Sequence, residues 1–280
     1  MYAPTRAAGA RYVALAVGVP VLAASALSLA TRRWPLARAA VVAVTTWTVL
    51  GGRSLHREAA ALARSLQIGD LAAARRRLPN LAGRDPAGLD ERELARATIE
   101  SVAENTSDAV VAPLFWGAVA GLPGLVGYRA VNTLDAMVGY RTPRYADFGT
   151  AAARADDLAN FVPSRLTALA FVMGAPLVGG LRPHTAWIWF RDGHRHPSPN
   201  AGQCEAAMAG ALGVRLGGRN VYFGQIEERP TLGDWRPPEP GDIERAIRLS
   251  AAAGAMAVGV AALRALSGPW RRLAARRRAR

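Results

Sequence analysis

The chain is 280 residues long, 51% of its residues are hydrophobic, and its formal net charge is +14. This pairing of apolar content with positive charge is typical of a membrane protein rather than a soluble one. All 35 basic residues are arginine and the only cysteine is Cys204, which excludes lysine-based P-loop and Schiff-base chemistry, an intrachain disulfide and a cysteine-built metal site.

Two apolar runs open the chain. Residues 12–30 carry no charge and are long enough to span a hydrocarbon core of roughly 30 Å. A second uncharged run covers residues 39–52 and reaches a comparable length if Arg38 snorkels to the interface. Residues 1–52 are therefore predicted to form an N-terminal transmembrane hairpin. A cleaved signal peptide is the competing interpretation, but no small-residue cleavage site followed by a polar start is visible.

Residues 53–248 are predicted to form a helical catalytic region. Its first part, 53–78, places apolar residues at helical spacing among arginines and predicts an amphipathic helical pair that turns near Gly69. Asp90 can cap the next helix, with Glu93 at its third helical position.

Further apolar runs at 109–127 and 166–181 are interrupted by proline and glycine, so we expect broken or re-entrant membrane segments there. Residues 225–241 are interpreted as an exposed loop. Residues 249–280 should form a C-terminal membrane helix and an arginine-rich tail suited to anionic lipid. No strand pattern is convincing, so the expected fold is an all-α, polytopic membrane protein with helical surface loops. Arginine is abundant in several connecting segments and leaves the topology open.

The stretch from residue 98 to 113 carries the strongest signal of function. On a helix, Glu100, Glu104 and Asp108 share one face beside an apolar run, where like charges repel one another more than they do in water. The repulsion predicts a bound cation or an arginine cluster. The two alternatives are that these carboxylates hold Mg²⁺ themselves, or that they position arginines that hold phosphate. A solvated acidic face is the plainer interpretation.

Three more polar clusters follow this stretch, at 128–141, at 144–165 and at 198–205. Their amide, carboxylate and arginine side chains can coordinate a cation, hold a substrate or face a phosphate. The candidate residues are Asn132, Asp135, Arg144, Arg154, Asp157, Asn160, Arg165, Asn200 and Glu205. Asn200 can also cap a helix, whose N-terminus attracts phosphate. The pair His194 and His196 fits a loop better than a metal site, because no third histidine is nearby.

Four motifs in one order resemble the CobD/CbiB family of adenosylcobinamide-phosphate synthases. They are Ile99-Glu100-Ser101 through Pro113, Asn132-Thr133-Leu134-Asp135 with Met137-Val138-Gly139-Tyr140, Ala153-Arg154 with Asp156-Asp157, and Ser198-Pro199-Asn200-Ala201-Gly202 with Glu205 through Leu212. The resemblance covers residues 53–250. The Gly-Asp-Pro and His-Pro-Val motifs usual near the start of the family are not found before residue 53, and Ala109 and Arg129 stand where the family usually has glycine and lysine.

The resemblance implies an enzyme of the cytoplasmic membrane that joins adenosylcobyric acid to aminopropanol, or to its phosphate, through an amide bond at the expense of ATP. Such a reaction needs Mg²⁺ and arginines around the phosphates. We expect Glu100, Glu104, Asp108, Asp135 and Asp157 to bind Mg²⁺, with Glu104 and Asp108 at the reaction centre. Arg144, Arg154 and Arg165 would bind phosphates, Asn105, Asn132, Asn160 and Asn200 would orient substrate, and Glu205 would act as general base.

Two other classes of function compete with the ligase. One is a non-catalytic, AmpE-like membrane sensor or scaffold, and the other is a corrinoid transporter. The density of acidic and amide side chains favours the enzyme. Membrane lipid and the corrinoid and amine substrates are the expected partners, nucleic acid is not expected because no binding motif accompanies the positive charge, and the number of copies that assemble is left open.

Overall fold

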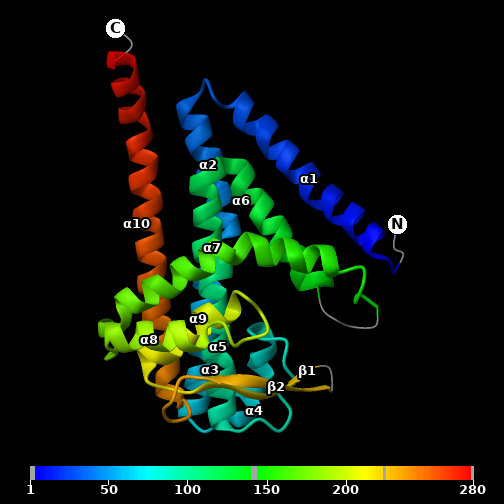
Figure 1. Ribbon diagram of the computed structural model, residues 1–280, viewed down its shortest axis with the longest axis vertical. Helices are drawn as coiled ribbons and strands as arrows, with labels where there is room; N and C mark the ends of the chain where they lie inside the picture. Colours follow the sequence, from blue (N-terminus) through cyan, green and yellow to red (C-terminus); the bar gives the residue numbers. More distant parts are fainter. Residues whose placement is uncertain (1–3, 140–143, 223–224, 279–280) are drawn as a thin grey trace. The chain divides into compact units, whose positions relative to one another are not determined.

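The computed structural model of the protein describes residues 4–139, 144–222 and 225–278 and is mainly helical (Figure 1). The α-helices are α1 (Arg6–Ala30), α2 (Pro35–Val49), α3 (Gly52–Gln67), α4 (Leu71–Arg77), α5 (Glu91–Thr106), α6 (Ala112–Val138), α7 (Thr150–Gly174), α8 (Arg182–Asp192), α9 (Ala201–Leu212) and α10 (Pro240–Arg278). Short 3₁₀ helices η1 (Leu78–Asn80) and η3 (Ala175–Val178) and the π-helical turn η2 (Ser107–Val111) join some of them. The predicted helical class is confirmed.

Within the described residues, five helical segments are long and apolar enough to cross a membrane: Arg6–Ala30, Pro35–Gln67, Glu91–Val138, Thr150–Val178 and Pro240–Ala265. Their lengths and compositions indicate a multi-pass membrane protein. The N-terminal helices also leave large apolar side chains uncovered, with Leu22 70%, Leu36 87% and Trp47 80% exposed. Lipid would cover these side chains at no hydrophobic cost.

Two of these segments depart from regular helix, as the sequence predicts. The π-helical turn η2 interrupts the regular α-helical pattern directly before α6, whose second residue is Pro113. Inside α6, Gly121 has φ +65° and ψ −146°, a conformation that only glycine adopts readily, and Pro123 follows. At the other segment, α7 ends at Gly174 and continues as η3.

The chain forms two compact units. Unit 1 comprises residues 1–50, 112–159 and 255–280. Within it α1 and α2 both pack on α6. A small buried cluster of Leu134, Val138, Phe148 and Ala152 lies under the side chains of α1.

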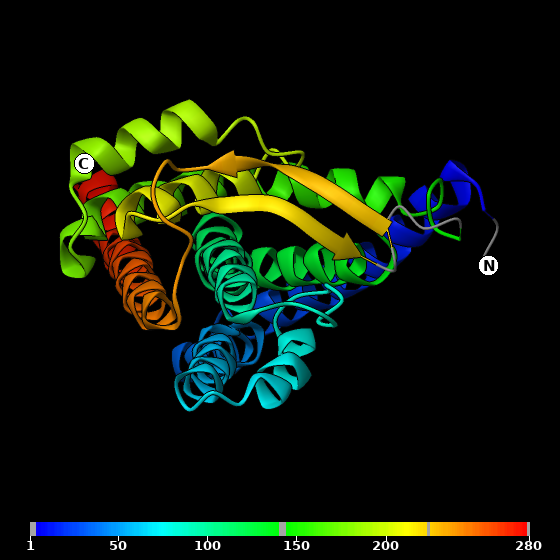
Figure 2. The same ribbon diagram turned by 90° about the horizontal axis from the view of Figure 1, so that it is seen from below.

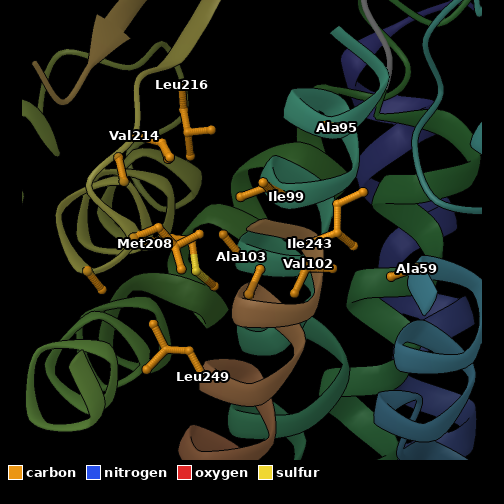
Figure 3. Packing of buried hydrophobic residues seen from close by; sticks show 14 of the residues in the cluster. Ala59, Ala95, Ile99, Val102, Ala103, Met208, Val214, Leu216, Ile243 and Leu249 are labelled. Carbon is orange, nitrogen blue, oxygen red and sulfur yellow. The ribbon is translucent and has the colours of Figure 1, made fainter. Parts of the chain in front are cut away.

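Unit 2 comprises residues 51–111 and 160–254 and contains the larger hydrophobic core. Helix α9 is at its centre: every residue of α9 except Gln203 is buried, and most of them are alanine or glycine. Such an all-round apolar helix must be enclosed by others. In Figure 3, Ile99 of α5, Met208 of α9 and Leu249 of α10 belong to this core, and each fully buried large side chain stabilises it by about 1.5–3 kcal/mol.

The predicted amphipathic helical pair is confirmed as α3 and α4, and the predicted cap of α5 is confirmed in full. Asp90 Oδ1 accepts from the N–H of Glu93 at 2.8 Å, and Glu93 Oε2 accepts from the N–H of Asp90 at 3.0 Å. This capping box begins the helix that carries the acidic stretch.

The loop interpretation of residues 225–241 is wrong in its first half. Residues Leu216–Tyr222 (β1) and Gln225–Leu232 (β2) form an antiparallel hairpin in unit 2, with Leu216 paired to Leu232 (Figure 2). A bulge between Leu216 and Gly218 is permitted by positive φ at Gly217 and Gly218. The strands were missed because glycine and charged residues interrupt the apolar alternation that identifies a strand.

The boundaries predicted at residues 52 and 248 lie close to two positions where the chain passes between the units, after residue 50 and after residue 254. The region 53–248, which we expected to be continuous, is divided by the segment 112–159, which belongs to unit 1.

Candidate functional site

Glu100 on α5 is buried between two arginines of unit 2. The Arg84 guanidinium donates to Glu100 Oε2, and Arg96 Nη1 donates to Glu100 Oε1 at 3.3 Å. The N–H of Gly217 on β1 donates to the same Oε1 at 2.7 Å. These contacts neutralise the charge of the carboxylate and connect α5 to the hairpin. They favour the alternative in which Glu100 positions arginines over direct binding of Mg²⁺.

The other two carboxylates of α5 and η2 occupy different surroundings. Glu104 is exposed, whereas Asp108 is half-buried on the π-helical turn. Asn105 Nδ2 donates to the carbonyl of Ser101 at 2.9 Å, which holds the amide along its own helix. The predicted acidic face therefore runs from a buried, neutralised end at Glu100 to an accessible end at Glu104. π-Helical turns such as η2 are frequent at functional sites.

A second polar cluster in unit 2 joins α7 to the start of α9. Asn200 Oδ1 accepts hydrogen bonds from Ser164 Oγ at 3.2 Å and from Arg165 Nη1 at 3.3 Å. The Arg165 guanidinium also lies 3.7 Å from the centroid of the Phe161 ring, and Asn160 on the same helix is buried. The structure thus brings together two predicted residues, Arg165 and Asn200, and buries a third, Asn160, on the helix that carries Arg165.

The predicted cap of α9 is corrected. Asn200 is at the N-cap position, but its side chain makes no capping hydrogen bond. Instead Ser198 Oγ accepts from the N–H of Ala201 at 3.2 Å, so the serine satisfies the helix end and the asparagine turns toward α7. Gly202 permits this close packing, because a Cβ there would lie 2.5 Å from the carbonyl oxygen of Gly193 and from His196 Cβ.

Glu205 on α9 is the least satisfied polar side chain of this region. It is buried, its Oε1 lies 4.0 Å from His196 Nε2, and its Oε2 has no hydrogen-bond partner among the described residues. His196 lies in the loop between α8 and α9, as predicted, but it faces the core rather than solvent. Arg229 on β2 approaches the same ring, with Nη1 3.1 Å from His196 Nε2.

The surroundings of both buried groups favour the neutral form. Burial, and then the nearby Arg229, lowers the pKa of His196 from 6.5 to about 4. Arg229 Nη1 lies 3.1 Å from His196 Nε2, and on the other side of the ring the N–H of Ser198 lies 3.0 Å and its carbonyl oxygen 3.4 Å from Nδ1, so Nδ1 can accept from the N–H or donate to the carbonyl, according to the tautomer. Burial, and then the charges of Glu100 and Glu104, raises the pKa of Glu205 well above 4.5.

The remaining predicted residues lie in unit 1. Asn132 Nδ2 on α6 donates to Asp156 Oδ1 on α7 at 3.3 Å, and Asp135 is half-buried one turn further along α6. Asp157 is half-buried on α7, whereas Arg154 and Arg144 are exposed. Among the described residues, no three His, Cys, Asp or Glu side chains lie close enough to form a metal site by themselves.

Sequence reasoning missed four residues of the unit 2 site: Arg84, Arg96, His196 and Arg229. Arg96 had a usable signal, because it is one helical turn before Glu100 and can form an i, i+4 pair. Arg84 and Arg229 lie in a loop and in a strand far along the chain, so no spacing relates them to α5. His196 was considered only as a metal ligand.

Comparison with known proteins decides the family. The family described as CobD/Cbib protein matches residues 2–250. The chain belongs to the CobD/CbiB family. The "Cobalamin biosynthesis protein CobD" of Mycobacterium tuberculosis is 53% identical over 250 residues, which cover 89% of this chain and 79% of that protein. The CobD proteins of Geobacter metallireducens and Rhodobacter capsulatus are 52% and 47% identical, and each alignment covers 85% of this chain and 74% of the relative.

No solved structure matches the chain. The geometry of Glu205, His196 and the arginines therefore comes from this chain alone, while membership of the CobD/CbiB family confirms the resemblance found in the motifs.

Proposed function

We propose that the chain forms an amide bond at the expense of ATP, joining adenosylcobyric acid to aminopropanol or aminopropanol phosphate. Membership of the CobD/CbiB family supports a role in cobalamin biosynthesis and hence a corrinoid substrate. The observation that carries the proposal is Glu205, whose buried Oε2 has no hydrogen-bond partner in the part of the chain that the structure describes. A buried polar atom left in this state calls for an explanation, and a catalytic role is one.

The proposed reaction has two balanced steps. A carboxylate oxygen of the corrinoid attacks the γ-phosphorus of ATP, so that ADP leaves and an acyl phosphate forms. The amine nitrogen then attacks the acyl carbon, the amide C–N bond forms, and inorganic phosphate leaves with the electron pair of the broken C–O bond. No covalent enzyme nucleophile is needed, so the side chains must supply charge, orientation and a base.

Glu205 is the proposed base. The attacking amine arrives as an ammonium ion at neutral pH and must lose a proton before its nitrogen is nucleophilic. A carboxylate whose pKa is raised by burial is a stronger base than an ordinary glutamate, which suits it to accept that proton. The positive charges of Arg84 and Arg229 would stabilise the carboxylate once it is ionised.

The phosphates are assigned to arginines and to Mg²⁺. Glu104 and Asp108 are carboxylates one turn apart, and one or two protein carboxylates with phosphate oxygens and water suit Mg²⁺. Bound there, Mg²⁺ would offset the negative charge of the transferred phosphoryl group. Arg165 is the proposed phosphate ligand in unit 2. The assignments of Arg144 and Arg154 to phosphate and of Asp135 and Asp157 to Mg²⁺ concern unit 1 and stay predictions.

The asparagines Asn105, Asn132, Asn160 and Asn200 are proposed to orient substrate, and the cytoplasmic membrane is the proposed location. Five apolar helices support a membrane location. Recovery of the chain in the membrane fraction after a carbonate wash would test it, and recovery in the soluble fraction would contradict it.

The test of the metal assignment uses Glu104→Gln and Asp108→Asn in an assay of ATP-dependent amide formation. We expect both to raise the Mg²⁺ concentration needed for half-maximal rate by about 10-fold or more. Glu91→Gln is the matched control, because Glu91 is an exposed carboxylate on the same helix. Unchanged Mg²⁺ dependence in folded Glu104→Gln and Asp108→Asn would end the assignment.

A further inference from the structure

An open pocket with a volume of about 400 Å³ lies in unit 2 between the start of α5 and the hairpin. It shares Arg96 and Gly217 with the contacts of Glu100 but contains none of the residues proposed to bind substrate, phosphate or Mg²⁺ or to act as a base. Its lining residues are Asp90, Arg92, Glu93, Arg96, Arg215, Leu216, Gly217, Gly218, Arg219, Thr231, Pro237 and Pro238. Volumes of a few hundred cubic ångströms suit small-molecule ligands.

Four arginines and two carboxylates line the pocket, so its lining has a net positive charge. Arg96 is committed to Glu100 and to the carbonyl of Gly217. Arg92, Arg215 and Arg219 are exposed and form no ion pair within the described part of the chain. The two acidic residues of the lining accept backbone N–H groups in the capping box of α5.

The arginines of the lining outnumber its carboxylates, so the pocket attracts anions. Arg92 lies in the first turn of α5, at the positive end of the helix dipole, where a cation is disfavoured. Arg215 and Arg219 flank the bulge of β1, and Glu228 is paired with Arg219 across the hairpin. A guanidinium group can bind two oxygens of one phosphate through parallel hydrogen bonds.

We propose that this pocket binds a phosphate-bearing anion through Arg92, Arg215 and Arg219. The phosphate could belong to a soluble phosphate ester or to the headgroup of an anionic lipid, and both present the same chemistry to the arginines. The inference goes beyond the proposed amide ligation, because it concerns binding at a separate pocket.

The test measures binding of pyrophosphate to the full-length protein in nanodiscs of phosphatidylcholine by titration calorimetry. We expect the Arg215→Gln/Arg219→Gln variant to bind pyrophosphate at least about 10-fold more weakly than the wild type, the equivalent of one lost charged hydrogen bond. The matched control is Arg76→Gln, because Arg76 is an exposed arginine of unit 2 that is not part of the pocket. It should bind like the wild type.

A second arm identifies the source of the phosphate. The same proteins are incubated with phosphatidylglycerol vesicles, with and without pyrophosphate. Selective loss of pyrophosphate binding in the double variant supports a soluble ligand, and selective loss of phosphatidylglycerol binding supports a lipid headgroup. The proposal is overturned if the wild type binds neither probe, if the double variant binds both like the wild type, or if Arg76→Gln is equally impaired. Amide formation is measured separately, so failure of this proposal and of the ligase proposal are distinguishable.

Discussion

His196 Nε2 lies 4.0 Å from Glu205 Oε1, and both side chains are buried in unit 2. The same imidazole nitrogen is 3.1 Å from Arg229 Nη1. An imidazolium would place two cations in contact, whereas a neutral ring can accept from the guanidinium. These contacts connect β2, the loop between α8 and α9, and α9 through Arg229, His196 and Glu205, and the charges of His196 and Glu205 depend on pH.

Glu205→Gln should lower the rate of amide formation by about 100-fold or more, because general bases typically contribute that much. Glutamine fills the same space and is neutral, like the protonated glutamic acid, so the melting temperature should change little. The measurement is the turnover rate beside a thermal melt. Glu91→Gln should keep the wild-type rate, and a Glu205→Gln protein of normal rate would remove Glu205 from the mechanism.

The rate of amide formation should also increase with pH. The base must be ionised, and burial raises the pKa of Glu205, so turnover should increase as pH rises through that raised pKa. The pH profile of the wild type, measured at saturating substrate, checks this expectation. A rate that is flat or falls over the same range would contradict the role of Glu205 as base.

The stability of the protein should fall on mild acidification because of His196. Its pKa is about 4 in the folded state and about 6.5 in the unfolded state, so between these pH values the unfolded chain binds a proton that the folded chain does not. This difference corresponds to up to about 3 kcal/mol, lost as pH falls from 6.5 to 4. Glu205, with a raised pKa, contributes with the opposite sign.

The check compares thermal melts of the wild type and of His196→Asn at pH 7 and pH 5. The wild type should lose more stability on acidification than the variant does. Equal losses in the two proteins would show that His196 is not the responsible group.

Glu100→Gln separates the structural role of Glu100 from a role in metal binding. The substitution leaves buried Arg84 and partly buried Arg96 without their shared carboxylate, and breaking a buried ion pair costs about 3–5 kcal/mol. We expect a lower melting temperature with no change in the Mg²⁺ concentration needed for activity. A normal melting temperature with a raised Mg²⁺ requirement would reverse this assignment.

More of the fold than of the candidate site could be predicted from the sequence. The apolar runs at 12–30 and 39–52 and the capping box of Asp90 and Glu93 are local signals, and they placed helices correctly. The hairpin was missed because its pairing joins residues such as Leu216 and Leu232 through backbone hydrogen bonds, which leave little trace in a glycine-rich sequence.

The candidate site depended on longer-range contacts. The stretch around Glu100 was recognised from its own charge pattern. Arg84, which pairs with Glu100, lies in a loop 16 positions away, and no helical or strand spacing relates the two residues. Likewise, Ser198 rather than Asn200 caps α9, because the side chain of Asn200 accepts a hydrogen bond from Ser164 on α7. Such choices are decided by tertiary packing.

Gly202→Ala should destabilise unit 2 by about 1–3 kcal/mol, since the added methyl group would overpack the contact with Gly193 and His196. Gly241→Ala is the matched control, because a Cβ there meets no atom within 4 Å. Thermal melts of both variants test the expectation. It would be contradicted by equal melting temperatures in the two variants.

ATP-dependent amide formation can be measured in a single reaction. The purified protein is incubated with adenosylcobyric acid, aminopropanol or its phosphate, ATP and Mg²⁺, and both ADP and the corrinoid product are quantified. We expect one ADP to be released for each amide formed, with none of either when the corrinoid is omitted. Corrinoid binding without ADP release or amide product would rule out the ligase and indicate a transporter or a scaffold.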